Sequence, residues 1–167
     1  MAKSKARAKA KAKAKARPAA KAKARPAKVE PVPKGYHTIT PVLTVSNGAQ
    51  AIEFYKKAFG AVELFRMTGP DGRSIAHAEL KIGDSLFMLG EEEPAMGAKS
   101  AQTLGGSSVN FYIYVKAVDA AVEKALAAGA KTVMPVTEIP GMVILAQFAD
   151  PEGNVVGIID ANYGQQS

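Results

Sequence analysis

The sequence contains no cysteine and only two histidines, His37 and His77. The absence of cysteine excludes disulfides, thiolate metal sites, iron–sulfur clusters and a cysteine nucleophile, and it fits a reducing compartment. Two histidines are too few for a histidine-rich metal site. No apolar run approaches the roughly 20 residues of a membrane span, and the N-terminus lacks the apolar segment of a secretory signal. We therefore expect a cytoplasmic chain without a membrane span.

Acidic residues are almost missing from residues 1–34, which hold 13 Lys and Arg but only one acid, Glu30, and so carry a net charge of +12. Within this stretch, residues 3–28 nearly alternate lysine with alanine, which places like charges four residues apart and leaves no apolar stripe. Prolines in residues 29–35 favour an extended linker. We expect a disordered basic tail, which either binds nucleic acid non-specifically, with nucleoid association as the result, or is only a solubilising extension.

The rest of the chain has the opposite charge balance. Residues 35–167 hold 9 Lys and Arg against 14 Asp and Glu, a net charge of −5. We expect one folded domain over residues 35–163. Alternation of β-branched residues predicts a strand over residues 39–45. The helical spacing of Ile52, Tyr55 and Phe59 predicts a helix over residues 49–59 that ends at Gly60. Three strands follow, at residues 62–67, 74–81 and 85–89.

The same order recurs after an acidic, then Gly/Ser-rich stretch at residues 91–106, which we expect to be a loop. The second set comprises a strand at 109–115, a helix at 118–128, and strands at 131–136, 141–148 and 154–160, with a turn at 150–153 between the last two. The sequence thus predicts a duplicated βαβββ module, with module one at about 37–90 and module two at about 108–161. The predicted fold class is α+β.

Two segments resemble a known family. Residues 45–60, VSNGAQAIEFYKKAFG, resemble the first strand and helix of the glyoxalase / bleomycin-resistance / extradiol-dioxygenase (vicinal oxygen chelate, VOC) superfamily, and residues 148–154, FADPEGN, resemble its late turn. Residues 77–80 and 82–85 are most similar to the PhnB-like subfamily. The resemblance covers about residues 37–161. It implies that the two modules form an open barrel-like sheet around a cavity, with the helices outside, and that the chain forms a homodimer.

Strand alternation then predicts which side chains face that cavity. On the strand at residues 85–89, we expect Leu86 and Met88 to face the helix. Ser85, Phe87 and Leu89 should then face inward. A cavity with this mixture of polar and aromatic groups suits a small, partly polar organic ligand. The predicted ligand-binding residues are Thr40, Thr44, Phe87, Asn110, Tyr112 and Tyr114.

The resemblance also implies four places for metal ligands, which fall on Thr40, Phe87, Asn110 and Gly157. None of these is a usual ligand of a transition metal, which prefers imidazole or carboxylate donors. We therefore expect no metal of the family's usual kind and no cofactor.

His77 and Glu79 lie two residues apart on one predicted strand and so share a face. An imidazole next to a carboxylate could act as a general base or orient a ligand, and these two are the candidate catalytic residues. The alternative is a polar pair on an exposed sheet face or at a dimer seam.

Three functions remain open. The first is a metal-free, PhnB-like protein that binds a small organic molecule. The second is a lyase, isomerase or oxygenase that uses His77 and Glu79. The third is a nucleic-acid-associated protein that acts through residues 3–28.

Overall fold

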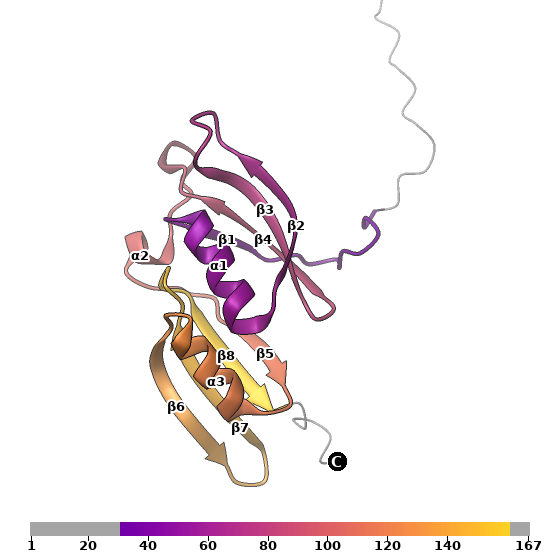
Figure 1. The fold of residues 1–167 in the computed structure, drawn as a ribbon, viewed down its shortest axis with the longest axis vertical. Helices are drawn as coiled ribbons and strands as arrows, with labels where there is room; N and C mark the ends of the chain where they lie inside the picture. Colours follow the sequence, from indigo (N-terminus) through magenta and orange to yellow (C-terminus); the bar gives the residue numbers. More distant parts are fainter. Residues whose placement is uncertain (1–30, 161–167) are drawn as a thin grey trace, which may run out of the picture. The chain divides into compact units, whose positions relative to one another are not determined.

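The computed structural model describes residues 31–160, and Figure 1 shows their arrangement. The disorder predicted for residues 3–28 concerns residues outside this range. The chain divides after Pro31, and the unit Val32–Ser167 contains all the helices and strands described below. None of the helices in residues 31–160 has the length and apolar character that a bilayer crossing requires.

Module one is a four-stranded sheet with one helix, as the sequence predicts. Its sheet has the strand order β1-β4-β3-β2, in which β1 pairs parallel with β4 and the other neighbours are antiparallel. The elements are β1 (Val42–Val45), α1 (Gly48–Phe59), β2 (Val62–Thr68), β3 (Ile75–Ile82) and β4 (Ser85–Glu91).

Module two repeats the plan, with the strand order β5-β8-β7-β6 and a parallel pair β5–β8. The stretch predicted as a loop contains two short helices. The first begins with a proline, and the second is capped by Ser100, whose side chain accepts a hydrogen bond from the Thr103 N–H. The elements are η1 (Pro94–Met96), α2 (Ala101–Leu104), β5 (Phe111–Val115), α3 (Val118–Ala127), β6 (Lys131–Ile139), β7 (Val143–Ala149) and β8 (Val155–Asp160). The tandem βαβββ prediction is confirmed.

Helix α1 begins and ends where its sequence provides caps. The Asn47 side chain accepts a hydrogen bond from the Gln50 N–H, and Gly60 adopts the left-handed conformation at φ 65°, which favours glycine. Between the two caps, Ile52 and Tyr55 lie on the apolar face of the helix that packs against the sheet, and both are buried. The sequence thus fixes both the length of α1 and the face that packs.

The helix-facing sides of both sheets share one hydrophobic core. Phe59 of α1 stacks on Phe148 of β7 with ring centroids 5.8 Å apart, and Phe54 packs edge-on against the same ring. The core continues into module one through Leu80 and into module two through Ile158, both fully buried. The opposite face of each sheet, here called its inner face, therefore points away from this joint core.

Buried carboxylates of the turn before β8 add a polar connection between the modules. Glu152 Oε2 accepts from the Ser46 N–H and from the Ser46 hydroxyl at 2.7 Å. Asp150 accepts from the Tyr55 hydroxyl at 2.8 Å and from the Asn154 side chain at 3.0 Å. Burial raises the pKa of Asp150, and burial together with Asp150 raises the pKa of Tyr55 well above its ordinary value.

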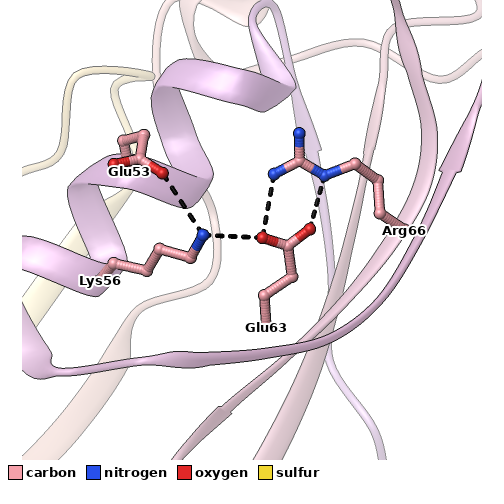
Figure 2. A network of polar contacts seen from close by, with 4 residues as sticks. All are labelled: Glu53, Lys56, Glu63 and Arg66. Carbon is pink, nitrogen blue, oxygen red and sulfur yellow. Dashed lines mark hydrogen bonds and ion pairs between the residues drawn. The ribbon is translucent and has the colours of Figure 1, made fainter.

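A second polar network joins α1 to β2 (Figure 2). Lys56 Nζ lies 3.4 Å from Glu53 and 2.8 Å from Glu63, and Glu63 also pairs with Arg66. The hydrogen bonds from Arg66 and Lys56 outweigh the opposing effect of burial and lower the pKa of Glu63 to about 2.

The predicted facing of residues 85–89 is wrong. Phe87 packs against the Tyr55 ring with centroids 5.0 Å apart, and Leu89 is fully buried in the core. The tight turn after β3 sets this register, since it pairs Leu80 with Phe87 and Ala78 with Leu89, and paired residues point to the same face. Both sets of side chains on β4 are apolar, so its own sequence cannot tell them apart.

Candidate functional site

The two modules meet along a cleft of about 510 Å³, here called the intermodule cleft. One wall is the approach to β1 and the start of β4, and the other is β5. The floor is apolar, while the hydroxyl groups of Ser85, Tyr112 and Tyr114, the imidazole of His37 and the carboxylate of Asp84 add polar character. Its lining residues include His37, Leu43, Tyr55, Ser85, Phe87, Phe111, Tyr112, Ile113 and Tyr114.

One polar feature at this cleft is the pair Tyr112 and Gln147. Tyr112, Gly157, Gln147 and Met134 form a row of paired residues across β5, β8, β7 and β6. Because Gly157 has no side chain, the Tyr112 ring lies over β8, and its hydroxyl accepts from Gln147 Nε2 at 2.7 Å. Sequence reasoning missed Gln147, although a polar residue between the core residues Ala146 and Phe148 would have signalled it.

His77 and Glu79 lie elsewhere, on the inner face of module one. Their side chains point the same way, as predicted, with His77 Nε2 3.5 Å from Glu79 Oε1. The Phe65 ring lies 6.1 Å from the imidazole. A hydrogen bond to Glu79 raises the pKa of the Tyr36 hydroxyl. This group is half-buried and polar, but it does not belong to the lining of the intermodule cleft.

The remaining predicted residues are dispersed. Thr44 lines a separate groove with Val109 and Asn154. Thr40 is half-buried two residues before β1, and Asn110 is exposed directly before β5. Of the predicted set, the intermodule cleft therefore brings together only Phe87, Tyr112 and Tyr114.

The places implied for metal ligands do not fit a metal. Phe87 faces α1 and has no donor atom. The neighbouring residue on the inner face of β4, Leu86, has no donor atom either. Gly157 lies under the Tyr112 ring. Among residues 31–160 there is no group of three or more His, Cys, Asp or Glu that could hold a metal ion. We therefore derive no chemistry through a metal at these positions.

Known proteins are similar to this chain in sequence or in fold. An uncharacterised protein of Mycobacterium bovis is 47% identical over 98 residues, which cover 57% of this chain and 64% of the relative, so the match spans less than two thirds of the relative's length. The antibiotic-binding protein TnmS3 from Streptomyces sp. CB03234 is similar in structure, with a TM-score of 0.54, 23% identity, and coverage of 74% of this chain and 94% of that chain. The PhnB protein from Bacillus cereus has a TM-score of 0.58 and 13% identity, with coverage of 75% and 100%.

These two structural likenesses concern the fold, because their sequence identities are below 25%. The family itself is shown by sequence: the family model for the Glyoxalase/Bleomycin resistance protein/Dioxygenase superfamily matches residues 36–158, which span both βαβββ modules. The chain therefore belongs to this superfamily.

Proposed function

We propose that this chain binds a small, partly polar organic molecule in the intermodule cleft, without a metal ion. The observation that carries the proposal is the cleft itself. Its volume of about 510 Å³ lies in the range of small-molecule sites. An apolar floor, with a few hydroxyl groups, an imidazole and the Asp84 carboxylate at the wall, can bury a ring or chain and orient its polar substituents.

The lack of metal donors supports binding over metal-dependent catalysis. Phe87 and Gly157 offer no side-chain ligand, and the Tyr112–Gln147 hydrogen bond lies over Gly157. A phenol and an amide at this position can recognise a ligand by hydrogen bonding. The likeness in fold to an antibiotic-binding protein agrees with a binding role.

A second copy of the chain is the proposed partner. The inner faces expose large apolar side chains: Val42 and Met67 on module one are 64% and 50% exposed, and Tyr114 on module two is 59% exposed. Exposed apolar side chains gathered on a sheet face favour an interaction surface. We propose that a homodimer covers them.

An enzymatic role is the second candidate, and the His77–Glu79 pair favours it. Their 3.5 Å separation and the adjacent Phe65 ring give an oriented imidazole in a half-buried site, which could accept a proton from a substrate. Turnover of any substrate would have to fall at least about 100-fold in His77→Ala for His77 to act as a general base. Unchanged turnover would remove the pair from the chemistry.

Nucleic-acid association is the third candidate, and it rests on the charge of residues 3–28 alone. A segment this basic releases counterions when it binds phosphates, so its affinity would fall steeply with salt. Replacing the lysines and arginines of residues 3–28 by glutamine in the full chain should abolish retention on duplex DNA at low salt. Retention that survives the replacement contradicts this role.

The cleft proposal is tested by filling the cleft. Ser85 is exposed at the start of β4 and lines the cleft, so Ser85→Phe places a ring inside it. A panel of small aromatic alcohols and amides is screened for compounds that raise the Tm of the full chain. We expect every such compound to lose its effect in Ser85→Phe and to keep it in Thr132→Phe, a control at an exposed position on β6. Stabilisation that persists in Ser85→Phe places binding elsewhere.

A further inference from the structure

A second open groove of about 600 Å³, here called the lysine groove, lies between the end of α1 and the connection from β5 to α3. It shares Ile82, Ile113 and Tyr114 with the wall of the intermodule cleft. Its own lining residues are Lys56, Lys57, Ala58, Phe59, Gly60, Val115, Lys116, Ala117, Ala120, Ala121 and Lys124.

The charge of this groove is opposite to that of the domain around it. Residues 35–167 carry a net charge of −5 and nine basic residues in all, yet four of the nine line this one groove, and none of its lining residues is acidic. Within residues 31–160, Lys56 is paired with carboxylates but Lys57, Lys116 and Lys124 are not, so these three lysines produce a local positive potential, which attracts anions.

Three of these lysines are free to bind a ligand. Lys56 is held between Glu53 and Glu63, as Figure 2 shows. Lys57, Lys116 and Lys124 are exposed, and none of them forms an ion pair with another residue in the range 31–160.

Between the lysines the groove is apolar. Phe59, Ile82 and Ile113 are half-buried, so each leaves part of its side chain accessible. A purely ionic partner such as a nucleic-acid backbone would leave this apolar surface in contact with water, whereas a ligand with an apolar body would cover it.

We propose that the lysine groove binds an amphiphilic organic anion, distinct from the ligand of the intermodule cleft. The carboxylate or phosphate of the ligand accepts hydrogen bonds from Lys57, Lys116 and Lys124, and its apolar chain lies on Phe59, Ile82 and Ile113. The positive charge of the lysines favours an anionic head group. The apolar floor favours a ligand with an alkyl chain over a small inorganic anion, because only the chain covers this surface.

The test uses the full chain and four probes with the same alkyl chain: octanoate, octyl phosphate, 1-octanol and octyltrimethylammonium. Binding is followed by the NMR cross-peaks of Gly60, Ala120 and Ala121, which report on this groove. We expect octanoate or octyl phosphate to bind, and their relative affinities to decide between carboxylate and phosphate. The alcohol and the cation should bind at least about tenfold more weakly, because they make no charge-assisted hydrogen bond with a lysine.

The variant Lys57→Gln/Lys116→Gln/Lys124→Gln should lose at least about tenfold in affinity for the anionic probe. The matched control Lys81→Gln/Lys99→Gln/Lys131→Gln removes the same charge outside the groove and should bind as the unmodified chain does, and thermal unfolding checks that both variants fold. Tyr112→Ala, which alters the intermodule cleft at a residue that does not line the lysine groove, should leave this binding unchanged, so that the two proposals can fail separately. The proposal would be overturned if both triple variants lost affinity equally, or if 1-octanol bound as well as the anionic probes. It would also be overturned if replacing these lysines weakened the binding of duplex DNA but not that of octanoate.

Discussion

The Tyr112 ring lies so close to Gly157 that a β-carbon on Gly157 would come within 2.5 Å of ring atom Cε1. Residue 157 is one of the places where the family resemblance implies a metal ligand. Here it is a glycine that lets a tyrosine from β5 reach Gln147 on β7. The inner face of module two is therefore built around an aromatic ring and one hydrogen bond.

Gly157→Ala should displace this ring. The added methyl group has no space, so we expect a loss of about 1–3 kcal/mol in the free energy of unfolding. In the double variant Gly157→Ala/Tyr112→Ala the ring is gone, and the alanine should then cost much less than in the presence of Tyr112. Chemical denaturation of the two single variants and the double variant measures this coupling. Additive effects would mean that the ring does not depend on the glycine.

The buried carboxylate of Glu152 should stabilise the joint between the modules. Glu152→Ala leaves the Ser46 N–H and hydroxyl without their acceptor, and we expect a loss of at least about 2 kcal/mol. Glu138→Ala, at an exposed position on β6, is the control and should stay within about 0.5 kcal/mol. Similar unfolding curves for the two variants would contradict the importance of this connection.

The Glu63 network predicts a pH dependence of stability. In the folded chain the pKa of Glu63 is about 2, below the ordinary value of 4.5. The stability that ionised Glu63 contributes is therefore complete above the ordinary pKa and is lost as the pH falls toward 2. Glu63→Gln should be less stable at pH 7, and its free energy of unfolding should fall less between about pH 5 and pH 2. Denaturation at a series of pH values measures this, and parallel curves for the two proteins would refute it.

The proposed dimer predicts which substitutions produce a monomer. Phe65→Glu/Met67→Glu places charges on the inner face of module one, where both residues are about half exposed, at 49% and 50%. We expect the mass measured by light scattering to fall by half. Met96→Glu, at an 86% exposed methionine in η1, should keep the dimer. An unmodified chain that is already monomeric would refute the proposed partner.

The sequence predicted the order of the elements because each boundary has a local cause. Gly60 ends α1, Asn47 caps it, and tight turns separate the strands of each sheet. It failed where the cause lies in another strand: β4 is apolar on both faces, and only pairing with β3 decides that Phe87 faces α1.

The site was predicted less completely, for the same reason. Alternation correctly placed His77 and Glu79 on one face, but their position relative to the intermodule cleft depends on how the modules pack. The turn before β8 was expected to serve only as a turn. The hydrogen bonds from Tyr55 to Asp150 and from Ser46 to Glu152 join residues about 100 positions apart in the sequence, so no local sequence pattern predicts them.

A native mass spectrum of the purified full chain tests the proposed function most directly, since it reports metal, organic ligand and subunit number together. We predict a dimer that carries a small organic molecule, or takes one up from the stabilising compounds of the screen, with no stoichiometric transition metal. One transition-metal ion bound per chain would contradict the account.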